Sequence, residues 1–592
     1  MMLRFAWLAW FTCAGVLATA TPTPEGGVLI VPPHAIATMR SPSASSCGTL
    51  MRVPVEGQPF PEALRCEVAA RPDPPWAIQF QFRTTRNVQK GEVLWARFYA
   101  RTLSAKNETG GGRVGVIFEK AGPPYDKALS FDLGLGREWN EYFLPFKSIS
   151  AYEAGQASAG FHLGTQIQTV EIADFEVYSF GPTYDMAKLP RTRIVYEGQA
   201  PDAPWRTAAA ARIEQLRKGD LTVVIADSAG RPVPGARITV SMRRHAFAWG
   251  SAVTAKDLLR QDADGDRYRA VVEKTFTRVV FENDLKWPVW DTPANRANTL
   301  RAADWLRTRN IEIRGHNLIW PSWLNMPRDV ITLKDNPEAL RRRITAHIAD
   351  EVDAWKGRLA DWDVINEPYS NHDVMDLLGK DEMAAWFKLA RQHDPNVRLT
   401  LNDYAILSAC GTDGHHQDHF EQTLRFLKER GAPITGLGLQ SHFDGTPTPP
   451  ERMLAILDRF AALGLDISIT EHDIDTTDEQ LQADFTRDFL TAVFSHPSVT
   501  AVLTWGFWEK SHWRPNAAYY RNDWSLRPAG QVWLDLVTRQ WWTHASLTTD
   551  AKGTAHARGF LGDYTVTVTH SGASKEVPVT LTRPGATISI SL

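Results

Sequence analysis

The sequence predicts an α/β protein whose central part is a (β/α)8 TIM barrel, with an N-terminal β-sandwich and small flanking β elements. Between residues 245 and 541, short apolar strand-like segments alternate with helical stretches, which is the pattern of parallel βα repeats. There are eight such segments, the number that closes a barrel. Alternating strand-like runs with Gly and Pro dominate before this part, and strands with turns return after it. The eight expected strands are 245–252, 277–282, 311–316, 362–366, 398–402, 436–441, 466–470 and 501–505.

The N-terminus has the pattern of an export signal. An apolar run from Phe5 to Leu17 follows a short basic start, and Ala18-Thr-Ala20 is a small-x-small cleavage site. We therefore expect cleavage near Ala20 and a secreted or periplasmic protein. Cys47 and Cys66 are close enough in sequence to bridge in an oxidising compartment, so we expect a disulfide between them.

The other parts of the chain follow from local patterns. A helical segment near 205–218 precedes two strand runs around a turn-rich stretch, and strands return at the C-terminal end. We expect these two β pieces to pair into one small unit beside the barrel. The predicted divisions are 1–20 as signal peptide, 25–182 as a sandwich that resembles carbohydrate-binding modules, 205–244 as linker helix and β-hairpin, 245–541 as barrel and 545–592 as C-terminal β extension.

Composition narrows the class of partner. The 592 residues are 43% hydrophobic and 22% charged, the mix of a soluble globular protein, and a net charge of −3 provides no broad basic surface for nucleic acid or an anionic membrane. The chain has no Gly-Lys-Ser/Thr phosphate loop, no Gly-x-Ser-x-Gly elbow and no His-Glu-x-x-His. We expect a monomer that needs no metal or other cofactor and binds a neutral partner.

Two glutamates occupy the positions where barrel enzymes place their chemistry. Glu367 ends the expected strand in Asp361-Trp-Asp-Val-Ile-Asn-Glu-Pro, and Glu471 ends another strand three strands later. A single Glu at a strand end is usually a salt bridge or a helix cap. Two carboxylates at one rim, with Asn366, His442 and Asp473 beside them, favour the acid/base and nucleophile pair of a retaining glycosidase.

Six short motifs resemble those of glycoside hydrolase family 10, the endo-β-1,4-xylanases, in order and in their positions on the strands. The resemblance implies that Glu367 is the acid/base, that Glu471 is the nucleophile and that Asn366 binds the sugar 2-hydroxyl, with His442 and Asp473 supporting Glu471. The motifs are Glu282-Asn-Asp-Leu-Lys-Trp, Arg314-Gly-His-Asn-Leu-Ile-Trp, Trp362-Asp-Val-Ile-Asn-Glu-Pro, Asn402-Asp-Tyr, Leu437-Gly-Leu-Gln-Ser-His and Ile469-Thr-Glu-His-Asp-Ile.

The same resemblance implies a set of substrate-binding residues. The substrate would be a plant cell-wall polysaccharide of the xylan type. One departure stands out, because Pro321-Ser-Trp323 replaces the His-Ser-Gln usual in the family and could reshape one end of the cleft. The implied residues are Glu282, Asn283 and Lys286 around the neighbouring sugar on the non-reducing side, and His316, Trp320, Tyr404, Gln440, Trp505 and Trp513 around the cleavage subsite.

The sequence leaves three other functions open. Pro321 and Trp323 are compatible with an exo-acting enzyme or with hydrolysis of another β-glycoside. A non-catalytic polysaccharide-binding protein is a second alternative, although binding alone would not require both Glu367 and Glu471. A metal-dependent barrel hydrolase is a third, made less attractive by the absence of a His-x-His strand motif.

Overall fold

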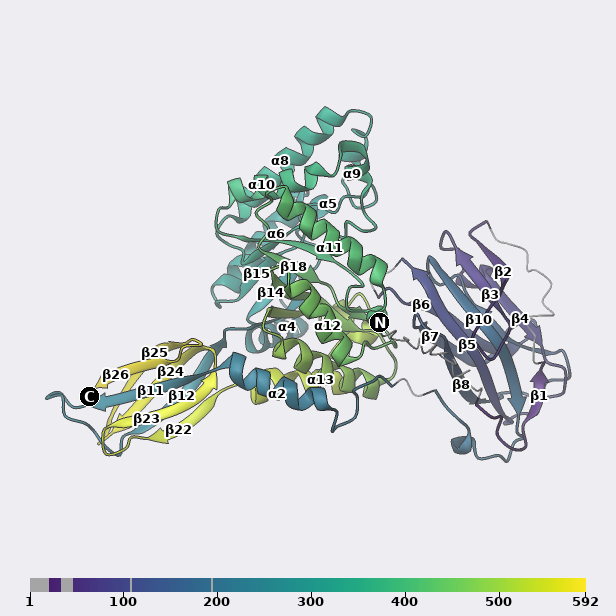
Figure 1. Cartoon of the computed structure of the whole chain (residues 1–592), viewed down its shortest axis with the longest axis horizontal. Coiled ribbons are helices and arrows are strands. Elements are labelled where there is room, and N and C mark those ends of the chain that lie inside the picture. Colours follow the sequence, from purple (N-terminus) through teal and green to yellow (C-terminus); the bar gives the residue numbers. More distant parts are fainter. Residues whose placement is uncertain (1–20, 33–45, 107–108, 193–194) are drawn as a thin grey trace, which may run out of the picture. The chain divides into compact units, whose positions relative to one another are not determined.

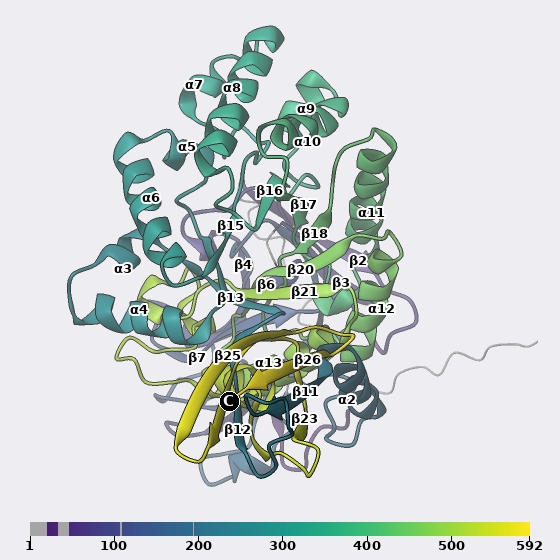
Figure 2. The same cartoon turned by 90° about the vertical axis from the view of Figure 1, so that its left-hand side faces the viewer.

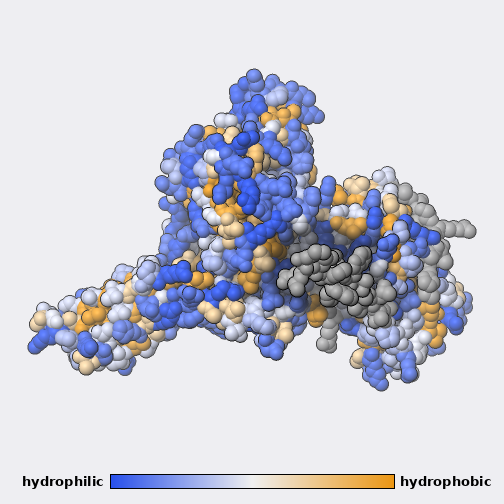
Figure 3. All heavy atoms as spheres, viewed as in Figure 1, coloured by the Kyte–Doolittle hydropathy of each residue, from blue (hydrophilic) through white to orange (hydrophobic). Residues whose placement is uncertain are grey.

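A computed structural model describes residues 21–32, 46–106, 109–192 and 195–592 of the chain. Two compact units make up the chain, the first essentially the residues up to Arg193 and the second Ile194–Leu592 (Figure 1). The predicted signal peptide, 1–20, lies outside the described residues. In the described ranges, no helix is both long enough and apolar enough to cross a membrane. Hydrophilic side chains predominate on the face drawn in Figure 3, with hydrophobic ones in small groups.

The first unit is a sandwich of two antiparallel sheets. Large apolar side chains of both sheets, among them Phe98, Phe118 and Phe161, form its core, because alternate residues of each strand face inward. One sheet contains β1 (Val28–Val31), β2 (Gly48–Pro54), β3 (Glu62–Val68), β10 (Gln168–Ser179), β5 (Val93–Ala105) and β8 (Asn140–Lys147). The other contains, in spatial order, β4 (Gln79–Arg83), β9 (Ala157–His162), β6 (Gly112–Lys120) and β7 (Lys127–Leu135).

The predicted disulfide between Cys47 and Cys66 is wrong. Cys66 is a free thiol in the sandwich core, where burial raises its pKa to about 12. The register of β2 and β3 pairs Cys66 with Leu50, so Cys47 is offset by three residues, about 10 Å along the strand. A disulfide requires Cα atoms within about 7 Å of each other, so the strand register excludes it.

Eight parallel strands in the second unit close into a barrel, which confirms the predicted fold class. Each strand pairs with its neighbours in chain order, and pairing of β20 with both β18 and β21 completes the closure. The strands are buried on both faces, as expected when helices surround a parallel sheet. They are β13 (Ala248–Val253), β14 (Arg278–Phe281), β15 (Glu312–Gly315), β16 (Asp361–Asn366), β17 (Arg398–Asp403), β18 (Gly436–Leu439), β20 (Asp466–Ile474) and β21 (Val499–Thr504).

Helices follow the strands and surround them (Figure 2). Aspartates cap several helices, for example Asp413, which accepts the backbone N–H of His416 at the start of α11. The larger helices are α4 (Ala263–Thr275), α6 (Pro293–Arg307), α8 (Pro337–Trp355), α10 (Asp381–His393), α11 (Gly414–Glu429), α12 (Pro450–Ala461), α13 (Glu479–Ser495) and α14 (Pro528–Asp535). Shorter ones are α3 (Ala255–Leu259), α5 (Trp287–Trp290), α7 (Arg328–Ile331) and α9 (Asp373–Leu378).

Segments before and after the barrel form one small β unit of two sheets, as predicted. The expected hairpin over 205–244 is wrong, however, because its two strands belong to different sheets and pair with C-terminal strands instead. One sheet contains β23 (Thr554–Phe560), β11 (Lys218–Ala226) and β26 (Ala586–Ser591). The other contains β22 (His544–Thr548), β12 (Arg237–His245), β24 (Gly562–His570) and β25 (Ala573–Leu581).

The last residue of helix α2 (Pro204–Arg217) joins this β unit to the barrel. The guanidinium of Arg217 donates to the backbone carbonyls of Phe494, His496 and Val499. It also lies 4.9 Å from the ring centre of Phe247. Phe494 packs in turn on His245 and Phe560, so the barrel and the β unit share one hydrophobic core.

Candidate active site

Glu367 follows strand β16 at the C-terminal rim of the barrel. All six residues of β16 are buried, and Glu367 then adopts a left-handed φ of 54°, uncommon for a residue with a side chain. The backbone N–H of Glu367 donates to the carbonyl of Asn402 at 2.8 Å, which holds this conformation. Since Pro368 has no N–H to continue the pairing, the chain leaves the sheet here and the carboxyl group stays at the rim.

Neutral N–H groups bind both oxygens of the Glu367 carboxyl group. Trp320 Nε1 and Asn371 Nδ2 each donate to Oε2 at 3.1 Å, and Gln440 Nε2 donates to Oε1 at 2.8 Å. The side chain is 9% exposed, so a substrate atom could still reach it. These three bonds fix the orientation of the carboxyl group, and each of their donors is uncharged.

Glu471 lies within strand β20 and has different partners. Asn402 Nδ2 donates to its Oε1 at 2.8 Å, and His442 Nε2 lies 3.2 Å from its Oε2. The backbone N–H of Glu471 donates to the carbonyl of Gln440. Gln440 therefore contacts Glu367 through its side chain and Glu471 through its backbone, and links the two glutamates structurally.

Asp473 lies behind His442 and controls its charge. His442 Nδ1 is 2.9 Å from Asp473 Oδ1, and Trp513 Nε1 donates to Asp473 Oδ2 at 2.7 Å. Burial disfavours the imidazolium, but Asp473 and Glu471 outweigh it and raise the pKa of His442 to about 9. Burial likewise opposes ionisation of Asp473, yet His442 lowers the pKa of Asp473 to about 2. Glu471 therefore faces an imidazolium at neutral pH.

Asn402 connects the two halves of the site. Its Nδ2 donates to Asn366 Oδ1 at 2.9 Å as well as to Glu471, and its Oδ1 accepts the hydroxyl of Thr470 at 2.8 Å. Every polar atom of this amide is thus engaged, which fixes its orientation. Asn402 holds the nucleophile candidate and the predicted sugar-binding amide in one rigid arrangement.

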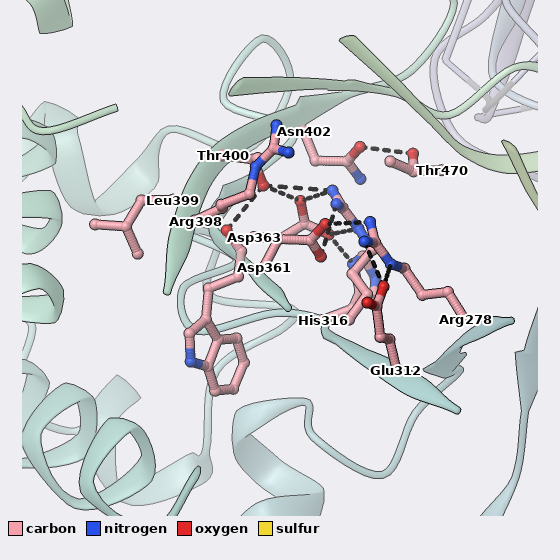
Figure 4. Close-up of polar contacts among 12 residues, drawn as sticks. Arg278, Glu312, His316, Asp361, Asp363, Arg398, Leu399, Thr400, Asn402 and Thr470 are labelled. Carbon is pink, nitrogen blue, oxygen red and sulfur yellow. Dashed lines mark hydrogen bonds and ion pairs between the residues drawn. The ribbon is translucent and has the colours of Figure 1, made fainter. Parts of the chain in front are cut away.

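His316 belongs to a charged network inside the barrel (Figure 4). His316 Nδ1 lies 2.9 Å from Asp363 Oδ2, and Asp363 also contacts Arg314 and Thr400. Burial opposes the ionisation of Asp363, but Arg314 and His316 lower its pKa. Nδ1 of this buried ring also lies 4.0 Å from Glu471 Oε1, and Trp505 lies edge-on to the ring with ring centres 5.1 Å apart.

The residues predicted to bind the neighbouring sugar lie on the loop after β14. Lys286 Nζ donates to Asn283 Oδ1 at 2.8 Å and lies 5.0 Å from the ring centre of Trp320. Burial raises the pKa of Glu282, and its interaction with Glu471 contributes in the same direction. This loop therefore lies near Glu471 and beside Trp320, the residue that donates to Glu367.

The loop in which Pro321-Ser-Trp323 replaces His-Ser-Gln is hydrogen-bonded to the segment that follows Glu367. The N–H of Trp323 donates to Asp373 Oδ2 at 2.9 Å, and Asn325 Nδ2 donates to Asn371 Oδ1 at 3.3 Å. The Trp323 side chain is half-buried and packs on the barrel core. A hollow of about 170 Å³ between Lys286, Trp320 and Leu324 lies beside this loop.

The structure brings the predicted site residues together around one rim. Tyr404, the remaining one, is buried and interacts with Ser370 and with Glu367. Three residues that position this site were not assigned from the sequence: Asn371, Asn402 and Asp363. Asn402 ends a strand in a recognised motif and could have been assigned, whereas nothing in the local sequence distinguishes Asn371. In the described ranges, no three His, Cys, Asp or Glu side chains are grouped to hold a metal ion.

Comparisons with known proteins agree with this geometry. Residues 239–532 match the profile of glycosyl hydrolase family 10. The chain is 32% identical over 376 residues to anti-sigma-I factor RsgI6 of Acetivibrio thermocellus, covering 63% of this chain and 47% of RsgI6. It is 30% identical over 425 residues to endo-1,4-beta-xylanase 1 of Arabidopsis thaliana, covering 69% of this chain and 44% of that protein. The chain thus spans less than half of either relative.

A shorter relative is covered more fully. Endo-1,4-beta-xylanase 5 of Pyricularia oryzae is 34% identical over 281 residues, which cover 44% of this chain and 67% of that protein. Among solved structures, xylanase 10B of Thermotoga petrophila in complex with xylobiose aligns with a TM-score of 0.45 and 24% identity, over 50% of this chain and 95% of that one. On the profile match and these relatives, the chain belongs to glycosyl hydrolase family 10.

Proposed function

We propose that the chain is an exported, retaining glycoside hydrolase that cleaves the β-1,4-linked backbone of xylan-type polysaccharides. The observation that carries this proposal is the unequal setting of two buried carboxyl groups. Neutral donors hold Glu367, whereas an imidazolium and an amide hold Glu471. Separate environments of this kind allow one carboxyl group to keep a proton while the other stays ionised.

The reaction would proceed in two steps. In the first, a Glu471 oxygen attacks the anomeric carbon, the glycosidic C–O bond breaks and Glu367 gives its proton to the departing oxygen. In the second, water attacks the same carbon, passes a proton to Glu367 and releases the Glu471 carboxylate from the sugar ester. Two displacements retain the anomeric configuration, and this mechanism requires the two carboxyl groups to lie about 5 Å apart.

The neighbouring groups have supporting roles. The His442 imidazolium favours the ionised, nucleophilic form of Glu471, and Asp473 keeps that ring charged and oriented. Because Asn366 Oδ1 accepts from Asn402, we assign the Nδ2 of Asn366 to the sugar 2-hydroxyl. Lys286 and Asn283 would bind the next sugar toward the non-reducing end.

Export is a second part of the proposal, based on the N-terminal sequence. Cleavage after Ala20 would leave Thr21 as the first residue of the mature protein. Sequencing the N-terminus of the protein recovered from outside the cytoplasm tests this directly. A protein that retains Met1 and stays in the cytoplasm would contradict export.

Two alternatives have specific support. The half-buried Trp323 and the exposed Leu324 beside the sugar-binding loop favour an altered product pattern, including exo-type release or another β-glycoside. A non-catalytic polysaccharide-binding role is the second candidate, because aromatic side chains such as Trp505 and Trp513 at this rim could hold a sugar chain without cleaving it. Both glutamates and their partners are present in this chain, which argues for catalysis.

One experiment separates these functions. The purified protein and the variant Glu471→Ala are incubated with glucuronoxylan, arabinoxylan and mixed-linkage glucan, and the products are resolved by chain length. Mixed xylo-oligosaccharides from the unmodified protein alone support an endo-xylanase. A single short product indicates exo action, products from the glucan alone indicate another β-glycosidase, and retention of the polymers without cleavage indicates a binding protein.

A further inference from the structure

A polar groove lies on the N-terminal sandwich, which forms the first unit, whereas the catalytic residues belong to the second. It has a volume of about 690 Å³ and lies on the outer face of the sheet β4-β9-β6-β7. No residue of the groove belongs to the part of the chain that matches the glycosyl hydrolase profile.

The strand pattern explains why this face is hollow. Phe80 and Phe161 point into the core, so Gln79, Gln81 and Gly160 between and beside them face outward. A Cβ atom on Gly160 would lie 2.0 Å from the carbonyl oxygen of Phe80, so no side chain fits at this position in the sheet centre. The floor of the groove therefore stays open between the polar side chains of the outer strands.

These polar side chains form a connected and orderly set. Gln81 Nε2 donates to Gln79 Oε1 at 3.0 Å and to Glu119 Oε1 at 2.8 Å, and the Ser158 hydroxyl donates to Gln81 Oε1 at 3.0 Å. Lys127 Nζ lies 2.6 Å from Glu119 Oε2. Such a network fixes amide and carboxylate groups in place before a ligand arrives, which lowers the entropy cost of binding.

An exposed aromatic side chain lies at each end of the groove. Trp76, 54% exposed, precedes β4 and lies beside His162 with ring centres 6.0 Å apart. Tyr125, 52% exposed, lies in the turn between β6 and β7 at the other end. The segment carrying Trp76 is held by the N–H of Gly164, which donates to the carbonyl of Pro75 at 3.1 Å. Both rings line the groove and present flat apolar surface to it.

The charges of the groove favour a neutral ligand. Glu119 is paired with Lys127, and the Arg83 guanidinium donates to the backbone carbonyls of Ala121 and Gly155. Burial lowers the pKa of His162, so this ring is neutral at pH 7. Arg83 keeps its charge, but its Nη1 is already bound to two carbonyls, so a phosphate or a nucleic acid would meet no cluster of basic groups here.

We propose that this groove is a second polysaccharide-binding site, in which an extended neutral chain of sugars lies across the polar floor between Trp76 and Tyr125. Sugar hydroxyls would replace water on Gln79, Gln81 and Ser130, and the apolar faces of the rings would stack on the two aromatic side chains. The groove runs from the level of Gln79 to that of Arg83 on β4, about 13 Å along the strand, which exceeds one sugar ring. The choice of xylan as the first probe rests on the proposed function.

The test uses the full chain carrying Glu471→Ala, so that the polymer stays intact. Its mobility is measured in native gels containing glucuronoxylan, arabinoxylan or mixed-linkage glucan. Adding Trp76→Ala and Tyr125→Ala should weaken the affinity for at least one polymer by about tenfold, the usual loss on removing an anchoring aromatic contact. Met51→Ala, an exposed substitution on the opposite sheet, is the matched control and should change nothing.

The outcomes are separable from those of the catalytic proposal. Equal retardation of the aromatic variant and the Met51→Ala control in all three polymers, or no retardation of any protein, overturns the inference. Thermal unfolding of each variant checks folding, and Gln81→Ala provides a second probe of the floor, expected to weaken binding in the same polymer. The aromatic variant could migrate faster than the control while the unmodified protein cleaves no xylan. That result would reject the proposed function and still support this binding site.

Discussion

The Nε2 atom of His442 lies 3.2 Å from Oε2 of Glu471, and both side chains are buried. With Asp473 at 2.9 Å on its other nitrogen, His442 is a cation held between two carboxylates. This relationship places a positive charge beside Glu471, as the proposed mechanism requires of its nucleophile. It also makes stability depend on pH in a defined direction.

The charged His442 should stabilise the barrel at neutral and lower pH. Its pKa rises from 6.5 to about 9 on folding, so this stabilisation is complete below about pH 6.5 and is lost as the pH rises through about 9. We expect His442→Asn to lower the free energy of unfolding by a few kcal/mol at pH 6, where its unfolding temperature should fall most. The difference from the unmodified protein should narrow toward pH 9.5. A difference that stays constant across this range, measured by thermal unfolding in matched buffers, contradicts the account.

Glu367→Ala should slow hydrolysis in proportion to how much the leaving group needs a proton. On xylan we expect a loss of about 10² to 10⁴-fold, the usual contribution of general acid catalysis. An aryl xylobioside with a dinitrophenol leaving group needs no proton and should lose far less in its first step. Rates on the two substrates, with azide added as a replacement nucleophile, measure this. Equal losses on both substrates would mean that Glu367 is not the acid.

Asn371 should position the acid/base carboxyl group. Removing its 3.1 Å bond to Glu367 Oε2 by Asn371→Ala is expected to cost about 1 kcal/mol, or about fivefold in kcat/KM on xylan. The lost donor favoured the ionised carboxylate, so the alkaline limb of the kcat/KM profile should move to higher pH. Asn325→Ala removes a contact to Asn371 and leaves the bond from Asn371 to Glu367 in place, so it serves as the control with a smaller change. An unmoved limb in Asn371→Ala argues against this role.

Lys286 should recognise the second sugar rather than the one being cleaved. Its ammonium group lies over Trp320 and is held by Asn283, on the loop beside the cleavage subsite. We expect Lys286→Ala to raise KM for an aryl xylobioside severalfold and to leave hydrolysis of the matching aryl xyloside unchanged. Loss on both substrates would place Lys286 at the cleavage subsite instead.

The barrel could be predicted because each strand carries its signal locally. Segments such as 361–366 are short and apolar and are soon followed by a residue that ends the strand. Because all strands of a parallel barrel run in one direction, their C-terminal ends meet at one rim. Glu367 follows from that rule, since it comes directly after β16, whereas strand β20 continues past Glu471 to Ile474 and ends later than the sequence predicts. The partners of Gln440 and Asn402 depend on strands far apart in sequence, and only the closed barrel brings them together.

Two predictions were wrong for one physical reason, which is that closeness in sequence does not reveal how strands pair or in which register. β11 and β12 look like a hairpin locally, but they pair with C-terminal strands in two separate sheets. Cys47 and Cys66 are close in sequence, yet the register of β2 and β3 offsets them by three residues. Register is set by which faces are buried, and two nearby cysteines do not report it. Asn371 was missed because its role depends on a turn after Glu367 rather than on a motif.

A covalent label at Glu471 tests the central claim most directly. The unmodified protein is incubated with a 2-deoxy-2-fluoro-xylobioside bearing a dinitrophenyl leaving group, and its intact mass and digested peptides are measured by mass spectrometry. The account predicts release of one dinitrophenol per chain, a gain of one fluoroxylobiosyl group, and its location on Glu471. A chain that cleaves xylan but gains no label, or carries it on another residue, would contradict a mechanism that passes through Glu471.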